Sequence, residues 1–330
     1  MEEEEEEEKR LYPFRFCALQ NDYIWGSETF RAADLGYRDS LIRDGWLAGN
    51  SFSEIMDTYM DRVSGQFSFD LFGRQFPLCI RTIKVNGKMP LRVHPDDETA
   101  LDRYDLLGKE KLWYVADSEE DAAILLGWNR DTNASEMIDA FDRPDRLPEM
   151  LNRVRAEKGM LLHIPSGTVH AAVGKLELLE IAEASPLDFC LHSWGEERSE
   201  EEFDPALSGL DALDFIDYKA YSSEMPKPAT QGEVSVLLEL PQFTVKRIEL
   251  RDGLKVCNGE NDGFSLFSCV QGRARVLCDE CKPLPLDCGE TALVPAECEE
   301  FVLEPADRDT ILLETSIPAR HIPDRYIDKD

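Results

Sequence analysis

The stretch Leu91-Arg92-Val93-His94-Pro95-Asp96-Asp97-Glu98 decides the fold of this chain together with two later stretches. These are Leu107-Gly108-Lys109-Glu110-Lys111-Leu112-Trp113-Tyr114-Val115 and Ile164-Pro165-Ser166-Gly167-Thr168-Val169-His170-Ala171. Each has the pattern of a strand or of a strand that runs into a turn. Together they bring two imidazoles, those of His94 and His170, into one β-structure.

The sequence around these motifs predicts a β domain with helical additions. A helix is expected at 52–60, with Ser51 or Ser53 as its N-cap. The pair Asn86-Gly87 predicts a turn after the first strand. A helical insertion is expected at 133–157, split by two prolines. Short apolar strands are expected at 77–85, 91–94, 112–116, 123–128, 160–164, 176–182 and 188–193.

The C-terminal part has a different spacing of predicted strands and turns. From Glu233 to Thr315, short strands recur about every 8 to 12 residues between glycine-containing turns, which is typical of a sandwich or barrel. It contains no histidine before His321, so we expect no metal site there. The predicted organisation is a disordered acidic tail (1–10), a first β-barrel domain (11–195), a helical linker (196–228) and a second jelly roll (229–330).

Charge and composition limit the classes of function. The 330 residues carry a net charge of −31, which argues against a surface for nucleic acid or anionic membrane. Apolar stretches fall short of the roughly 20 residues that span a bilayer, and Glu2–Glu8 is unlike a secretory signal. We therefore expect a cytoplasmic protein whose nine cysteines are mostly small buried hydrophobes. Cys278-x-x-Cys281, with Cys288 and Cys298 following, leaves a zinc or redox interpretation open.

In order and spacing, the three motifs resemble the type I mannose-6-phosphate isomerases, which are zinc-dependent aldose–ketose isomerases of the cupin superfamily. The segments Tyr12-Pro13-Phe14, Tyr23-Ile24-Trp25-Gly26 and Ile216-Asp217-Tyr218-Lys219 extend the resemblance over most of residues 11–220. It implies a mainly β fold of two cupin-type jelly-roll barrels, with helical insertions in and after the first. It also implies carbohydrate metabolism, with a small sugar phosphate as the partner.

The resemblance implies at most one zinc ion per chain, with His94 and His170 at ligand positions. Arg92 stands where longer members carry a ligand glutamine, and Lys111 stands where the family carries a ligand glutamate. An ammonium within about 4 Å of a divalent cation is repelled by roughly 8 kcal/mol at an effective dielectric near 20. We therefore expect an altered metal site.

The same resemblance assigns the acid/base role to Glu180, with Lys109 as a second catalytic candidate. An active-site arginine of the family falls on Cys190. Glu110 is next to Lys111, and adjacent side chains of a strand point to opposite faces. Glu110 is therefore expected to face away from the barrel interior.

Two interpretations of the basic residues stay open. Arg92 and Lys111, with Lys109, could bind a sugar phosphate without metal, or they could form ion pairs with Glu110, Glu180 or Glu183. Two functions stay open as well. The chain is either a mannose-6-phosphate isomerase-like protein with impaired or altered catalysis, or a non-catalytic sugar-phosphate-binding or regulatory cupin. The sequence predicts no particular protein partner.

Overall fold

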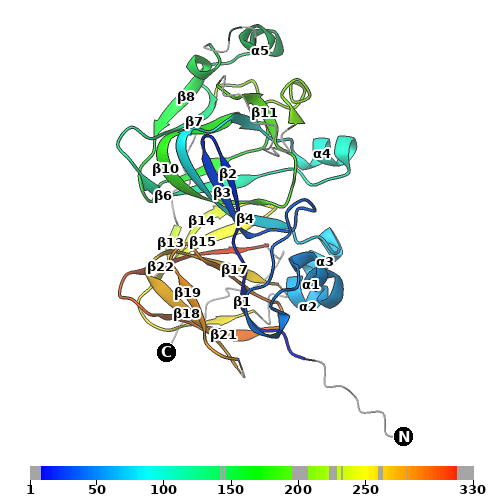
Figure 1. Cartoon of the computed structure of the whole chain (residues 1–330), viewed down its shortest axis with the longest axis vertical. Helices are drawn as coiled ribbons and strands as arrows, with labels where there is room; N and C mark the ends of the chain where they lie inside the picture. The colour runs from blue at the N-terminus through cyan, green and yellow to red at the C-terminus, as the bar shows by residue number, and fades with distance from the viewer. Residues whose placement is uncertain are drawn as a thin grey trace, which may run out of the picture. The chain divides into compact units, whose positions relative to one another are not determined.

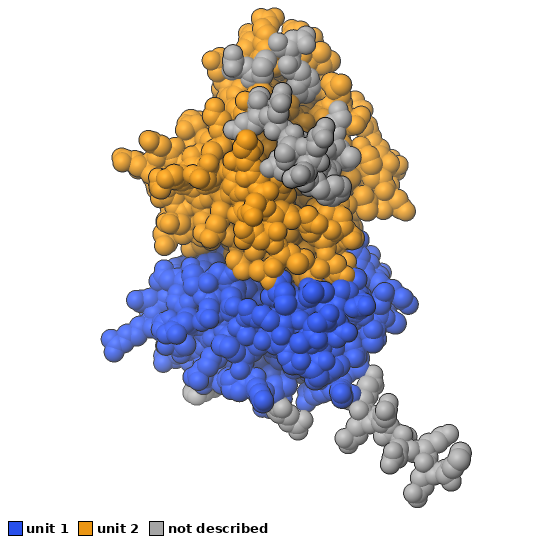
Figure 2. Space-filling view, in the orientation of Figure 1, with its two compact units in different colours: residues 1–17, 41–76, 228–330 blue, residues 18–40, 77–227 orange. Residues whose placement is uncertain are grey.

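The computed structural model describes residues 9–141, 143, 146–194, 207–222, 229–231, 233–258, 263–279 and 281–317. The chain is mainly β, and its curled antiparallel sheets confirm the predicted class of cupin-type barrels with helical insertions (Figure 1). It divides into two compact units, which Figure 2 colours separately. Unit 1 consists of residues 1–17, 41–76 and 228–330, and unit 2 of residues 18–40 and 77–227.

Unit 2 is organised around β10 (His170–Glu183), a long strand that pairs antiparallel with β4, β5, β6 and β7. Alternate residues of β10 belong to two different core clusters. Ala171 and Val173 pack in one cluster, and Ala172 packs in the other. The other strands of unit 2 are β2 (Leu19–Tyr23), β3 (Gly26–Ala32), β4 (Leu78–Lys88), β5 (Leu91–Val93), β6 (Lys111–Ser118), β7 (Ala123–Trp128), β8 (Leu151–Arg155), β9 (Leu161–Ile164), β11 (Phe189–His192) and β12 (Leu207–Ser208). Its helices are α4 (Asp97–Tyr104), α5 (Ala134–Phe141) and the 3-10 turn η2 (Pro148–Met150).

Three local predictions for unit 2 were wrong. Asn86-Gly87 makes no turn, because β4 continues through it and pairs with Lys175 and Gly174 of β10. Residues 151–155 form β8 rather than helix, because they pair with β7. In the predicted helical linker, residues 207–222 form a two-residue strand and turns. The remainder of the linker lies outside the described residues.

Unit 1 contains a seven-stranded sheet and a four-stranded sheet. Both contribute to one core, in which the rings of Phe267 and Phe301 are 5.7 Å apart. The larger sheet has the order β1 (Phe14–Arg15), β20 (Thr291–Val294), β17 (Ser265–Gln271), β22 (Thr310–Ser316), β15 (Thr244–Leu250), β14 (Val234–Glu239) and β13 (Ala229–Gln231). The smaller has the order β16 (Leu254–Cys257), β21 (Glu300–Pro305), β18 (Arg273–Cys278) and β19 (Leu284–Asp287).

The helices of unit 1 are η1 (Gly45–Leu47), α1 (Phe52–Tyr59), α2 (Asp61–Ser64) and α3 (Gln66–Phe72). Ser51 caps α1, and Glu54 completes the capping box, which settles the choice between the two predicted serines. No helix in the described part of the chain is long and apolar enough to cross a membrane.

The two units do not follow the predicted boundaries, because early segments pack with the C-terminal barrel. Strand β1 pairs with β20, so residues 14–15 complete a sheet that otherwise comes from residues after 228. The amide of Ala296 donates to the carbonyl of Val63, and the ring of Phe76 lies 4.5 Å from that of Phe264. Residues 11–17 and 41–76 therefore belong to unit 1, although the sequence placed them in the first domain. Of the predicted acidic tail, only residues 9–10 are described.

Candidate functional site

Strand β10 and its neighbours position the candidate side chains inside unit 2. His170 stands opposite Arg92 of β5, and Glu180 stands opposite Arg81 of β4 and Trp113 of β6. Residues that face one another across a sheet point to the same side. The motif residues therefore meet on one face of the curled sheet.

Glu180 is the most heavily bonded carboxylate of this cluster. The Nε of Arg81 donates to its Oε1 at 2.6 Å, and the Nζ of Lys111 and the Nε1 of Trp113 donate to its Oε2 at 3.1 and 2.7 Å. Burial opposes its ionisation, but the charges of Arg81 and Lys111 outweigh burial. They hold the pKa of Glu180 well below its ordinary value. Glu180 is therefore a fully satisfied, ionised carboxylate.

The two imidazoles are turned toward each other through their Nε2 atoms, which are 3.2 Å apart. The Nδ1 of His170 lies 2.8 Å from the carbonyl oxygen of Thr168, and that of His94 lies 3.0 Å from the carbonyl oxygen of Leu187. A carbonyl oxygen can only accept, so both Nδ1 atoms carry protons. Burial, and then the charge of Lys111, lowers the pKa of both rings, that of His94 to about 3. Two neutral rings thus present lone pairs to the same small volume.

The ammonium of Lys111 lies beside these lone pairs. Its Nζ is 3.4 Å from the Nε2 of His170, and the side chain is fully buried, with 0% of its surface exposed. Burial lowers the pKa of Lys111 to about 8, against the opposing charge of Glu180, so the amine is still mostly protonated at neutral pH. Lys111 therefore brings a positive charge to the imidazole pair.

A second buried carboxylate, Asp188, balances the other cations. Its Oδ2 lies 3.5 Å from a guanidinium nitrogen of Arg92 and 3.7 Å from the Nζ of Lys109. Its Oδ1 lies 3.0 Å from the Nδ1 of His94. The carboxylate of Glu28 bridges Arg81 and Arg92, at 3.1 Å from each. The cluster thus contains four cationic side chains and three carboxylates, which leaves one positive charge in excess while both imidazoles are neutral.

Glu110 points away from this cluster, as strand alternation predicts. Its carboxylate accepts from the amide and hydroxyl of Ser166 at 2.9 and 2.8 Å, and it lies 2.8 Å from the Nε2 of His163. Glu110 cannot replace a metal-ligating carboxylate on the inner face of β6 without a change of register. The inward side chain at that point of the strand is Lys111.

Glu183, at the end of β10, has a raised pKa, whereas that of Glu180 is lowered. It accepts from the amide of Glu110 at 2.7 Å, but burial and the charge of Asp97 raise its pKa to about 8. Because this pKa lies above the unfolded value of 4.5, folding takes up a proton between these two pH values. The contribution of Glu183 to stability is therefore lost as pH rises through that window.

We expect Glu183→Gln to remove this loss, since an amide oxygen can still accept from the amide of Glu110. Denaturant unfolding at about pH 8 should show the variant more stable than the unsubstituted chain by roughly 2–4 kcal/mol, with little difference near pH 4.5. The matched control is Glu119→Gln, whose side chain is 67% exposed and should change little. Equal pH slopes for Glu183→Gln and the unsubstituted chain would contradict the assignment.

The residues present do not fit a zinc ion, although two of them have the geometry of ligands. Two nitrogen ligands at 2.0–2.1 Å from a tetrahedral zinc are about 3.3 Å apart, close to the 3.2 Å between the Nε2 atoms of His94 and His170. The third ligand is missing, because an ammonium occupies its place and bonds to His170. Among the described residues, no group of three or more His, Cys, Asp or Glu is arranged to hold a metal.

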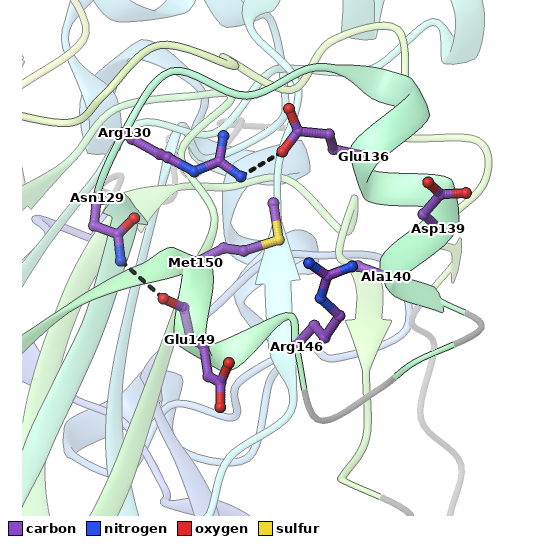
Figure 3. Close-up of a pocket in the computed structure, with 8 residues that line it drawn as sticks. All are labelled: Asn129, Arg130, Glu136, Asp139, Ala140, Arg146, Glu149 and Met150. Atoms are coloured by element: carbon purple, nitrogen blue, oxygen red, sulfur yellow. Dashed lines mark hydrogen bonds and ion pairs between the residues drawn. The ribbon is translucent and has the colours of Figure 1, made fainter.

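Two hollows lie among the described residues of unit 2. A cavity of about 10 Å³ lies beside the cluster, room for about one water; its lining includes Tyr37, Arg81, Arg92 and Asp188. A larger pocket, of about 340 Å³, lies between α5 and η2 and contains none of the motif residues (Figure 3). In that pocket Arg130 pairs with Glu136, and Asn129 donates to the carbonyl of Glu149.

Comparisons with known proteins show which proteins the chain resembles. The chain is 26% identical over 290 residues to the mannose-6-phosphate isomerase ManA of Bacillus subtilis, covering 81% of this chain and 88% of that protein. It is also 26% identical over 245 residues to a mannose-6-phosphate isomerase of Streptococcus mutans, covering 72% of each chain. No family model matches. Over most of its length the chain is therefore similar in sequence to mannose-6-phosphate isomerases.

Solved structures of the family share the fold. The structure of mannose 6-phosphate isomerase from Bacillus subtilis superposes with a TM-score of 0.80 at 19% identity, covering 92% of this chain and 99% of that one. A zinc-bound mannose 6-phosphate isomerase superposes with a TM-score of 0.71 at 12% identity, covering 94% of this chain and 100% of that one. Zinc is thus bound by one protein of this fold.

The structure brings all six predicted site residues into one cluster: Arg92, His94, Lys109, Lys111, His170 and Glu180. Their proposed roles in metal binding, substrate binding and catalysis remain predictions. Cys190, which was predicted to stand at the position of the family's arginine, lies opposite Arg92 in the pairing of β11 with β5; that predicted match remains a prediction.

Sequence reasoning missed Arg81, Glu28 and Asp188. Arg81 did leave a signal, because it directly follows the apolar residues 78–80 of β4, and a buried arginine needs carboxylate partners.

Proposed function

We propose that this chain is a sugar-phosphate-binding member of the mannose-6-phosphate isomerase family that does not carry out the zinc-dependent isomerisation. One observation carries the proposal. The ammonium of Lys111, 3.4 Å from the Nε2 of His170, takes the lone pair that a metal would need. The ammonium of Lys111 supplies the positive charge that a bound metal ion would supply. It neutralises Glu180 and holds the imidazole pair without a third ligand.

The state of Glu180 also argues against isomerisation. The reaction moves a proton between C1 and C2 of the sugar, so it needs a base that reaches the substrate and has a pKa near the working pH. Glu180 is 2% exposed, is held by three donors and has a pKa well below its ordinary value. An ionised carboxylate in this setting is a weak and inaccessible base.

Two features support binding of a phosphorylated sugar. The cluster carries one positive charge in excess, and a phosphate dianion would offset it. Lys109 is 5% exposed, and its ion pair with Asp188 is loose, at 3.7 Å. We assign the phosphate contact to Lys109, with the sugar outside the buried cluster. The named activity of the relatives, which act on mannose 6-phosphate, gives the class of ligand.

The catalytic half of the proposal is tested by metal analysis of purified protein, followed by a coupled isomerase assay with added zinc. We expect substoichiometric zinc and no turnover above the background rate. Stoichiometric zinc together with turnover of mannose 6-phosphate would overturn it.

The binding half is tested by calorimetric titration with mannose 6-phosphate, fructose 6-phosphate, mannose and inorganic phosphate. Only the sugar phosphates should bind well, and Lys109→Met should weaken them about tenfold, the effect of about 1.4 kcal/mol. The control is Lys84→Met, an exposed lysine paired with Glu177 in the same unit. If both variants respond alike, the assignment of the phosphate contact to Lys109 is wrong. If no sugar phosphate binds, a regulatory role without this ligand is favoured.

A further inference from the structure

Three thiols gather at one end of the four-stranded sheet of unit 1, far in sequence from the motifs of unit 2. Cys278 ends β18, Cys281 follows it in a turn, and Cys298 precedes β21, the partner of β18 (Figure 1). The Sγ of Cys278 donates to the carbonyl of Glu300, the first residue of β21, at 3.9 Å. Cys298 is buried, and its Sγ donates to the carbonyl of Leu11 at 3.8 Å. Cys278 and Cys281 are partly exposed.

The turn brings Cys278 and Cys281 within bonding range. The amide of Cys281 donates to the carbonyl of Cys278 at 3.2 Å, which closes a four-residue turn. Such turns keep the first and last Cα atoms within about 7 Å, and disulfides span Cα separations of about 4.4–6.8 Å. A disulfide between these two residues therefore needs no movement of the strands.

The surroundings of Cys278 favour its thiolate. The neighbouring thiol of Cys298, the charge of Arg10 and the thiol of Cys281 lower the pKa of Cys278 to about 7, against the effect of burial. The proximity of Cys278, and then burial, raises the pKa of Cys298 above its ordinary value. Cys298 therefore stays protonated, while Cys278 is the thiol that ionises.

We propose that Cys278 and Cys281 form a redox pair that exchanges with small-molecule disulfides, with Cys278 as the nucleophile and Cys281 as the resolving thiol. The Cys278 thiolate attacks one sulfur of the disulfide, which breaks that bond and releases one thiolate. Cys281 then loses its proton and attacks the Cys278 sulfur of the mixed disulfide, which releases the second thiol. Two protein thiols are oxidised, and one disulfide is reduced to two thiols.

Metal binding does not account for this cluster. A three-thiol group would suit zinc, but no group of three or more potential ligands is arranged to hold a metal among the residues that the structure describes. This inference stands on unit 1 alone, so it holds or fails independently of the proposed function.

The first test is the rate of alkylation of each cysteine by iodoacetamide against pH, followed by peptide mass spectrometry. At pH 7 a thiol with a pKa near 7 is about half ionised, against about 1% for an ordinary thiol with a pKa near 9. A thiolate of lower pKa is also intrinsically less nucleophilic, so the expected ratio of alkylation rates falls to about 5–10-fold. We expect Cys278 to exceed the exposed Cys288 by this factor. Equal rates and pH midpoints for the two would overturn the proposal.

The second test equilibrates the full chain with oxidised glutathione and maps the products. An intramolecular Cys278–Cys281 disulfide is expected in the unsubstituted chain, and a persistent mixed disulfide on Cys278 in Cys281→Ser. Cys298→Ala should raise the pH midpoint of Cys278 alkylation, and Cys288→Ser should change neither result. Should Cys281→Ser give the same products as the unsubstituted chain, Cys281 is not the resolving thiol.

Discussion

Replacing Lys111 with glutamate should convert this protein into one that binds about one zinc ion per chain. The substitution supplies the missing third ligand to a pair of imidazoles whose Nε2 atoms are already 3.2 Å apart. Without metal, Glu180 loses a cationic partner and gains a buried carboxylate as neighbour, which should cost about 3–5 kcal/mol of stability. Zinc at a hundredfold excess over its Kd should restore about 2.7 kcal/mol of that loss.

Metal analysis and thermal unfolding with zinc or a chelator measure both effects. Lys111→Met is the matched control, because it removes the ammonium without adding a ligand. It should be destabilised but should not respond to zinc. Adding His170→Gln to Lys111→Glu should abolish the response. An equal zinc response in the glutamate and methionine variants would mean that position 111 is not the ligand position of the family.

The sequence predicted the contents of the cluster better than the links within it. Local motifs placed Arg92, His94, Lys111 and His170 on strands, and strand alternation correctly turned Lys111 inward and Glu110 outward. Which carboxylate each cation would meet was not predictable, because a pairing such as Arg81 with Glu28 joins strands 53 residues apart. Alternation gives the face of a strand on which a side chain lies, whereas pairing depends on the order of the strands in the sheet.

The same limit explains the errors at the level of domains. Composition and turn signals suggested contiguous domains, but residues 14–15 complete a sheet with residues 292–293. The helical insertion predicted at 133–157 also failed in part, because residues 151–155 pair with β7. Leu151 and Val154 are three residues apart, a spacing that suits a helix. The backbone of these residues instead forms the hydrogen bonds of a strand with β7.

Arg81 is the side chain whose loss should destabilise unit 2 the most. Its guanidinium is 2.6 Å from Glu180, 3.1 Å from Glu28 and 3.8 Å from Asp188, and only 5% of the side chain is exposed. Arg81→Met would leave these carboxylates buried with fewer cations. Such a loss costs about 3–5 kcal/mol for a single broken pair, and at about 2–4 °C for each kcal/mol it should lower the Tm by roughly 6–20 °C.

Calorimetric unfolding measures this effect, and Arg273→Met is its control. The guanidinium of Arg273 also forms two bonds of 3.0 Å with a carboxylate, that of Asp307, but its side chain is 60% exposed. An exposed pair contributes about 0–1 kcal/mol, so the control should shift the Tm little. If both variants shift it equally, the buried cluster does not depend on Arg81. If Arg81→Met combined with Glu180→Gln is more stable than Arg81→Met alone, the cost lies in the uncompensated carboxylate, because the amide removes a buried negative charge while it preserves the shape of the side chain.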